Sequence, residues 1–441
     1  MARFLTLCVL AAGCAQESRT PPPTDVAASL DDEVATVVHV RWTTERASKG
    51  YVQYGPTKEM ALTSPMEAEL GTQHSATLLE LTADTPYYYR VVAWDGNEGS
   101  ASEVLTFDTG SLPNAVPTFT RDGEGQEELL VIPVRGPTAV AVSVVDPSGD
   151  VVWYHVEDRD VEVTRALVTR DRRSIVYNAI DGSDDASSEL VRIDLDDGSS
   201  TSVTIPGLAG DFVELRDGTL AAITSDTRDI DGTTVVGHQI VELDESGDPV
   251  PVWSAWDCFD PASVPPEVPE DGWTGANALA YDVGQDAYYI GLSGLSSIVK
   301  VPRQEGGCEW VLGGSAATFA FADGATPFAR QSHFDIRGDR LLVVDGDESG
   351  DGLRLLEYQI EFEAELLTEL SISSADVTVT DLPRGSVEQL DSAGTKLVNW
   401  AAAGRVELLD ADGATEWSVE AEAGSSFGYH SLVKTLYPET L

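Results

Sequence analysis

The chain has 441 residues, with 27 Lys or Arg against 75 Asp or Glu, so its formal net charge is −48. This balance argues against nucleic-acid binding and against attachment to an anionic membrane surface, because both require clustered cations. The chain is also 42% hydrophobic and contains nine Trp, which is the composition of a folded protein with sizeable cores.

The N-terminus resembles a bacterial lipoprotein signal. Arg3 precedes an apolar run that is too short to span a bilayer, and this run leads into Leu10-Ala-Ala-Gly-Cys14. We predict a signal peptide over residues 1–13 and lipidation of Cys14, with an ordinary secretory signal as the alternative. Ala15 after the cysteine favours the outer membrane or surface of a Gram-negative bacterium. The lipid anchor is then the only expected contact with a membrane.

A Pro-rich tether is predicted over residues 14–25, followed by a small β-sandwich over residues 26–110. Short strand-like runs separated by turn signals indicate the sandwich. Trp42, the L-x-x-L-x-x-x-T-x-Y pattern from Leu78 to Tyr87 and a closing T-F-x-T resemble a fibronectin type III domain. Such a domain serves as a spacer or, alternatively, as a binding module.

Residues 113–441 show a recurring hairpin pattern. A D-x-x-G type turn, as at Asp146–Gly149, leads into a strand that carries Val and Trp, as at Val151–Tyr154. A recurring hairpin of this kind indicates a β-propeller, and about 50 residues per blade gives about six blades. The predicted fold is therefore all-β, a fibronectin type III-like sandwich followed by a six-bladed propeller.

Two cysteines, Cys258 and Cys308, remain for the fold of an exported protein. An even pair in an oxidising compartment predicts one disulfide, with two buried free thiols as the alternative. Neither cysteine has the spacing of a zinc site.

Six short motifs in order carry a more specific resemblance. They read W-T-G-A-N at 273–277, L-S-S-I-V-K at 295–300, W-V-L-G at 310–313, Q-S-H at 331–333, V-D-G at 344–346 and R-L-L-E-Y at 354–358. Their order and spacing resemble the bacterial arylsulfotransferase family, whose members are six-bladed propellers.

The resemblance implies transfer of a sulfuryl group from a phenolic sulfate to another phenol. Such chemistry uses a neutral imidazole as nucleophile and cationic donors for the sulfate oxygens, and it requires no cofactor. The ligand implied is a small phenolic or anionic molecule. The catalytic candidates are His333, Arg354 and Asn277, and the substrate-binding candidates are Arg330, His430 and Trp273.

Several family positions are replaced in this chain. Gly275 stands where the family has His, Ser293-Gly294 stand for Arg-His, and Glu407 aligns with the candidate nucleophile. His430 replaces a closing Arg. The alternative function is therefore a non-catalytic surface propeller that binds a ligand or a protein partner, with His333 packed as an ordinary strand residue.

The acidic segment that begins at Asp345 matches the start of a calcium loop. Oxygen ligands at Asp345, Asp347, Ser349 and Asp351 alternate along a tight turn, but Leu356 stands where a bidentate Glu is expected. A solvated acidic loop is the alternative interpretation. The sequence does not indicate an oligomeric state.

Overall fold

The computed structural model describes residues 20–96, 98–260, 272–346, 352–374 and 385–438. The chain divides into two compact units. The first comprises residues 1–29, 38–78 and 86–108, and the second comprises residues 30–37, 79–85 and 109–441. Cys14 lies outside the described residues, so its lipidation stays a prediction. Within the described ranges, no helix has the length and apolar character needed to cross a membrane.

The first unit is the predicted sandwich, and its longest strand belongs to both layers. β2 (Val38–Gly55) pairs through its first half with β4 (Gly71–Leu78) and through its second half with β5 (Pro86–Trp94). The remaining strands are β1 (Thr24–Leu30), β3 (Leu62–Thr63), β6 (Gly99–Ala101) and β7 (Leu105–Asp108).

Aromatic side chains fill the core of the sandwich. Trp42 is 1% exposed and stacks on His74 with ring centroids 5.2 Å apart, and Tyr87 stacks on Phe107 at 5.4 Å. Gly50 lies against the Trp42 ring, where a Cβ atom would come within 2.5 Å of it. The predicted buried Trp42 is thus accommodated by a glycine on the same strand.

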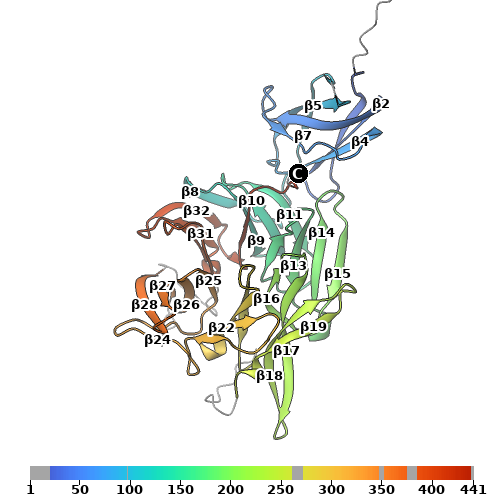
Figure 1. Cartoon of the computed structure of the whole chain (residues 1–441). Coiled ribbons are helices and arrows are strands. Elements are labelled where there is room, and N and C mark those ends of the chain that lie inside the picture. The colour runs from blue at the N-terminus through green and yellow to red at the C-terminus, as the bar shows by residue number, and fades with distance from the viewer. Residues whose placement is uncertain (1–19, 97, 261–271, 347–351, 375–384, 439–441) are drawn as a thin grey trace, which may run out of the picture. The chain divides into compact units, whose positions relative to one another are not determined.

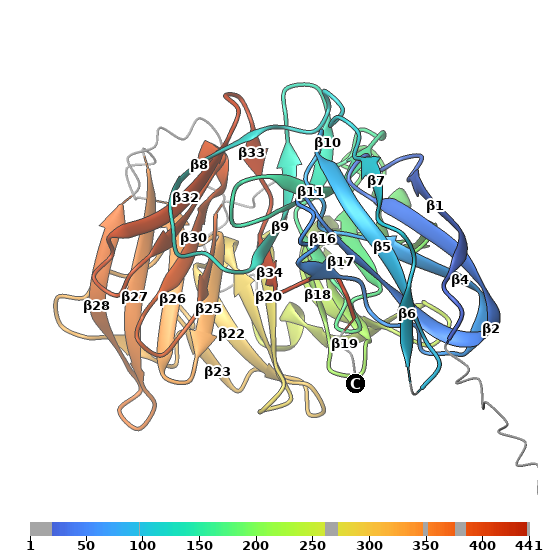
Figure 2. The same cartoon turned by 90° about the horizontal axis from the view of Figure 1, so that it is seen from above.

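The second unit is the predicted six-bladed β-propeller. Its blades follow one another in chain order around a common axis (Figures 1 and 2). Blade 1 contains β9 (Leu129–Arg135), β10 (Val140–Val145) and β11 (Val151–Glu157); blade 2 contains β12 (Ala166–Val168), β13 (Ser174–Ala179), β14 (Glu189–Asp194) and β15 (Ser200–Thr204); blade 3 contains β16 (Leu208–Glu214), β17 (Leu220–Ile230), β18 (Thr233–Leu243) and β19 (Pro249–Ser254).

The last three blades complete the ring. Blade 4 contains β20 (Ala276–Asp282), β21 (Ala287–Leu292), β22 (Ser297–Pro302) and β23 (Trp310–Leu312); blade 5 contains β25 (His333–Arg337), β26 (Arg340–Gly346), β27 (Leu353–Glu361), β28 (Leu366–Ser374) and β24 (Ala320–Phe321); blade 6 contains β29 (Ser386–Gln389), β30 (Lys396–Trp400), β31 (Arg405–Leu409) and β32 (Thr415–Ala421).

Strands from both ends of the propeller segment close the ring. β8 (Phe119–Gly123) adds to β32 at the outer edge of blade 6. From the C-terminal end, β33 (Ser426–Phe427) and β34 (Ser431–Val433) pair with β9 and form the inner edge of blade 1. Closure in this way leaves the sheet edges at the junction paired rather than open.

Aspartates at the turns explain the recurring sequence pattern. The Asp146 carboxylate accepts hydrogen bonds from the backbone N–H groups of Ser148 at 2.8 Å and Asp150 at 3.0 Å. The same pair of bonds recurs at Asp244 and Asp410. Much of the acidic excess therefore lies in turns, where carboxylates accept from backbone N–H groups.

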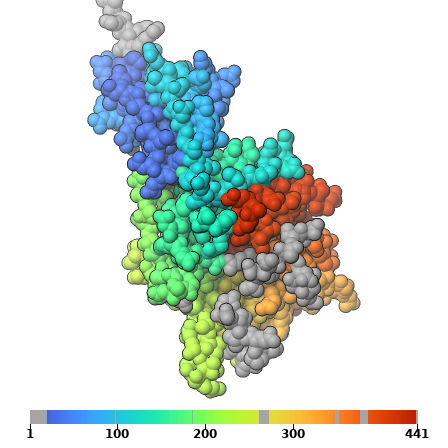
Figure 3. Space-filling view, turned by 180° about the vertical axis from the view of Figure 1, so that it is seen from behind, coloured from blue at the N-terminus to red at the C-terminus, as the bar shows by residue number. Residues whose placement is uncertain are grey.

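One hairpin extends well beyond its blade. β17 and β18 stay paired from Ala221 and Glu242 to Ile230 and Thr233, and their far ends project from the molecule (Figures 1 and 3). At the base of the projection, the Trp256 indole N–H donates to the Asp226 carbonyl at 2.9 Å. Nothing in the sequence analysis predicted this extension.

The predicted disulfide is confirmed and joins two neighbouring blades. Cys258 follows η2 (Ala255–Asp257) after blade 3, and Cys308 lies between β22 and β23 of blade 4. Their Cα atoms are 6.0 Å apart, and the bond closes a loop of 50 residues in sequence.

We expect the double variant Cys258→Ser, Cys308→Ser to lose up to about 4 kcal/mol of stability, because the bond removes loop-closure entropy from the unfolded chain. Chemical denaturation followed by far-UV circular dichroism measures the loss. The unmodified chain in reductant serves as the control and should lose a similar amount. An unchanged denaturation midpoint in both samples would contradict the expectation.

Candidate functional site

The inner strands of the blades bring polar residues to one rim of the propeller axis. The strands β34, β12, β16, β20, β25 and β29 form the inner edges of their blades; β34 contacts β12, and β16, β20, β25 and β29 contact one another in series. Polar residues lie within these strands or just before them: Arg165, Asp211, Asn277, His333, Ser386 and His430. We call Arg165, His333, Ser386, Tyr429 and His430 the axial site.

His333 is the first residue of β25 and is half-buried. Its ring centroid lies 4.9 Å from that of Tyr429, whose hydroxyl donates to the Ser332 carbonyl at 2.7 Å. The backbone N–H of Val387 points at His333 Nδ1 at 3.4 Å. This contact favours the neutral tautomer that carries its proton on Nε2.

His430 is 3% exposed and is held by Ser386 of blade 6. Ser386 Oγ lies 2.7 Å from His430 Nδ1, and the same oxygen accepts from Asn399 Nδ2 at 3.1 Å. Ser386 Oγ also accepts from the His430 backbone N–H at 3.3 Å, so both of its lone pairs are used. Its hydroxyl proton is then directed to Nδ1, which favours the tautomer that carries the His430 ring proton on Nε2. That Nε2 atom lies 3.9 Å from a Glu388 carboxylate oxygen.

Both histidines of the axial site are neutral at pH 7. Burial, together with the charges of Arg165 and His430, holds the pKa of His333 well below its ordinary value. Burial, and secondly the Arg165 guanidinium, lowers the pKa of His430 to about 3. Arg165 thus acts electrostatically on both rings.

Arg165 is one of three residues of the axial site, with Ser386 and Tyr429, that the sequence motifs did not indicate as candidates. Its Nη1 donates to the His430 carbonyl at 3.0 Å, and its Nε lies 3.5 Å from Asp211 Oδ1. Asp211 is fully buried and accepts from the Leu279 and Phe212 backbone N–H groups, while burial raises its pKa. The available signal was an arginine just before an inner strand. To use it, one would have to know which strands form the inner edges of the blades.

Two asparagines hold the rim together in the same way. Asn178 of β13 donates to the Gly210 carbonyl of the next blade at 2.9 Å. Asn399 of β30 donates to the Gly428 carbonyl of the next blade at 2.7 Å and also to Ser386. These buried amides fix the spacing between blades, and therefore the position of the axial side chains.

Asn277 and Trp273, two predicted site residues, lie in blade 4 and the segment before it. Asn277 Nδ2 donates to the Gln331 carbonyl at 2.7 Å, which ties β20 to the segment before β25. Trp273 is 5% exposed and packs against Trp256 with ring centroids 5.3 Å apart. Both residues make interior contacts, and their roles toward a substrate stay predictions.

The two predicted arginines of blade 5 are not among the axial residues. Arg354 lies on β27, two strands outward from His333, and forms a bidentate pair with buried Asp345 at 2.9 and 2.7 Å. Arg330 is exposed, and its backbone N–H donates to Ser296 Oγ at 3.1 Å. The positive charge of Arg354 is thus already balanced within its own blade.

The positions where basic family residues are replaced by glycine lie against each other. A Cβ atom on Gly275 would come within 2.7 Å of the Gly294 nitrogen, and one on Gly294 would come within 2.6 Å of the Trp273 carbonyl oxygen. The backbone therefore occupies the space that longer side chains would need. Glu407 lies 2.6 Å from both Arg405 Nη2 and Trp400 Nε1.

Carboxylates also lie near the axial site. Glu388 on β29 and Asp335 on β25 share Arg337, which lies 2.8 Å from the first and 3.3 Å from the second. Burial raises the pKa of both carboxyl groups, and the charge of Asp335 raises that of Glu388 further. With a side chain 33% exposed, Glu388 is a carboxyl that can exchange a proton with a bound molecule.

No metal centre is found among the residues that the structure describes. The calcium prediction rests on Asp345, whose carboxylate accepts from Arg354, and on Asp347, Ser349 and Asp351, which lie outside the described residues. Calcium binding therefore stays a prediction.

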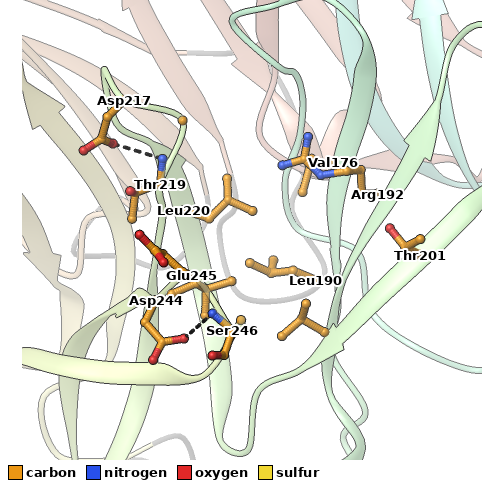
Figure 4. Close-up of a pocket in the computed structure, with 14 residues that line it drawn as sticks. Val176, Leu190, Arg192, Thr201, Asp217, Thr219, Leu220, Asp244, Glu245 and Ser246 are labelled. Carbon is orange, nitrogen blue, oxygen red and sulfur yellow. Dashed lines mark hydrogen bonds between the residues drawn. The ribbon is translucent and has the colours of Figure 1, made fainter.

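A cavity of about 500 Å³ lies away from the axial site, between blades 2 and 3. Figure 4 shows Leu190 and Arg192 on one wall and the turns at Asp217 and Asp244 on the other. None of the axial residues lines this cavity. The cavity lies next to the turn that follows β16, and its lining residues are not partners of the axial histidines.

Two family models match the chain. A model described as arylsulfotransferase matches residues 120–321, from the second residue of β8 through β24, so this part of the propeller is arylsulfotransferase-like in sequence. A model described as the N-terminal domain of purple acid phosphatase matches residues 23–109, which fits the fibronectin type III-like sandwich. His333, Arg354 and His430 lie beyond the first match.

Several solved structures are similar to the chain at low identity. A nidogen/laminin complex chain is 10% identical, with 70% of this chain and 99% of that chain covered and a TM-score of 0.43. The periplasmic gluconolactonase of Pseudomonas aeruginosa is 14% identical, with coverages of 88% and 99% and a TM-score of 0.42. A putative 6-phosphogluconolactonase from Bacteroides fragilis is 10% identical, with coverages of 88% and 98% and a TM-score of 0.39. None of the curated proteins matches the chain.

We expect the ring signals of His430 to show no titration between pH 8 and 5, because its pKa is about 3. The unfolded chain takes up this proton near pH 6.5, so His430 destabilises the fold as the pH falls below that value, by up to about 1.4 kcal/mol per pH unit. NMR of ring-labelled histidine measures the titration, and His430→Gln assigns the signal. A midpoint near 6.5 would contradict the expected burial.

Proposed function

We propose that the propeller is an arylsulfotransferase-like enzyme that moves a sulfuryl group from an aryl sulfate to a second phenol at the axial site. The observation that carries the proposal is the family match over residues 120–321, joined to a neutral, half-buried histidine at the rim of the same propeller. The substrate class is a phenolic sulfate as donor and a phenol as acceptor.

The contacts of His333 support a role as a hydrogen-bond donor to the substrate. With the Val387 N–H directed at Nδ1, the neutral ring presents an Nε2–H that can donate to a sulfate oxygen or to the leaving phenolate. In the transfer, the bond from sulfur to the donor oxygen breaks and a bond to the acceptor oxygen forms. Nucleophilic attack by Nε2 on sulfur would first require the ring proton to move to Nδ1.

Glu388 is the group that supports the proton transfer. Its raised pKa and partial exposure suit a carboxylate that removes the acceptor's proton, while the donor oxygen leaves as a phenolate that accepts a hydrogen bond from His333 Nε2–H. Its contact with His430 Nε2, at 3.9 Å, lies within the axial site.

A non-catalytic, ligand-binding propeller is the second candidate. The close approach of Gly275 to Gly294 favours it, because two basic positions of the family are replaced by backbone atoms. On this proposal the axial site binds a phenolic or anionic molecule, or a protein partner, without turnover.

We also propose that the protein is exported and anchored by lipid at Cys14. The disulfide between Cys258 and Cys308 supports export, since such bonds persist in oxidising compartments. Mass spectrometry of the membrane-extracted protein tests the anchor, and an unmodified Cys14 in the mature chain would contradict it.

Purified protein mixed with 4-nitrophenyl sulfate and a second phenol tests the transfer. We expect release of 4-nitrophenolate that depends on the acceptor, and a fall of at least about 100-fold in the variant His333→Gln. His155→Gln, in the outer strand of blade 1, is the matched control and should keep the rate of the unaltered protein.

Circular dichroism of each variant confirms that it is folded. Turnover by His333→Gln at the unaltered rate would refute the role of His333. Binding of the sulfate ester without any transfer would instead support the second candidate.

A further inference from the structure

We propose that Arg165 binds the sulfate group of an aryl sulfate at the axial site. The proposal rests on the proposed function only for the identity of the ligand. It assigns the anion-binding role to a residue outside the predicted motifs.

The Arg165 guanidinium is held from two sides. Blade 1 supplies the His430 carbonyl, 3.0 Å from Nη1, and blade 3 supplies the Asp211 carboxylate, 3.5 Å from Nε. The side chain is 16% exposed. Among the described residues no acceptor bonds to Nη2, so its N–H groups remain for a ligand. A guanidinium held in this way loses little further conformational freedom on binding an anion.

Neighbouring groups complete a site for a sulfate ester. Arg165 forms an isolated β-bridge with Tyr429, whose ring lies 4.9 Å from the His333 ring, and its Nη1 bonds to the His430 carbonyl. His333 presents an N–H from Nε2, and its ring lies beside Tyr429. A sulfate monoester has three terminal oxygens that accept from a guanidinium and an imidazole, and its aryl group can pack on the aromatic pair.

The nearby acids each have partners besides Arg165. Asp211 accepts from two backbone N–H groups as well as facing Arg165. Glu388 and Asp335 share Arg337, whose guanidinium lies 2.8 Å from the first and 3.3 Å from the second. The chain's net charge of −48 is screened beyond about 8 Å at physiological salt.

The other candidate cations are less suited to the role. Arg354 is already paired with Asp345 through both oxygens, and Arg330 is exposed outside the group of axial contacts. Arg165, in contrast, contacts His430 in the axial site. Its Nη2 has no bonded acceptor among the described residues.

Separate calorimetric titrations of the full chain with phenyl sulfate, with inorganic sulfate and with phenol test the proposal. Because the ligands are never mixed, the sulfate ester has no acceptor present. We expect Arg165→Gln to weaken phenyl sulfate about 10- to 100-fold and to leave phenol binding unchanged, because a charged hydrogen-bond donor is lost. Arg228→Gln, on the projecting β17–β18 hairpin and 47% exposed, is the matched control and should bind as the unaltered protein does. Weaker binding of inorganic sulfate than of phenyl sulfate would show that the aryl group contributes.

A second measurement on the unaltered protein does not depend on the folding of a variant. Phenyl sulfate bound at Arg165 should shift the NMR ring signals of His333 and His430 and raise the pKa of His333, because an anion offsets the guanidinium charge. Equal affinity of Arg165→Gln, no binding by the unaltered protein, or unshifted ring signals would each overturn the proposal. Absence of sulfuryl transfer alone would refute the enzyme and leave the binding result intact.

Discussion

Closure of the ring is the constraint on which the rest of the propeller depends. Both ends of the propeller segment close the ring here, through β8 to blade 6 and through β33 and β34 to blade 1. Because the closing strands lead to the inner edge, Tyr429 and His430 are placed beside His333. The axial site therefore exists only in the closed ring.

Hydrogen bonds between blades turn this closed ring into a defined site. Asn178 and Asn399 each bond to a carbonyl of the following blade, and Arg165 reaches blades on both sides of its own. Buried polar groups cost free energy unless they are paired, so these bonds select one spacing of the inner strands. That arrangement leaves neutral histidines, because burial and, secondly, the Arg165 charge oppose their protonation.

Much of the fold could be predicted because it follows from local patterns. Asp turns and alternating strands indicated the hairpins, Trp42 and its following motifs indicated the sandwich, and an even pair of cysteines indicated the Cys258–Cys308 disulfide. The length of the β17–β18 hairpin could not be predicted, since its exposed residues carry no burial pattern. The acidic excess was visible from the sequence, but its use as turn acceptors was not.

The sequence by itself determined the all-β class, the order of the two folds and the presence of His333 and His430 as candidates. Only the tertiary structure decided which cation shares the axis with them. Arg354 lies in a recognisable motif but is paired with Asp345. Arg165 lies in no motif and contacts His430 across a blade boundary. The physical reason is that a propeller axis is built from residues distant in sequence, so their proximity depends on blade register and ring closure rather than on local spacing.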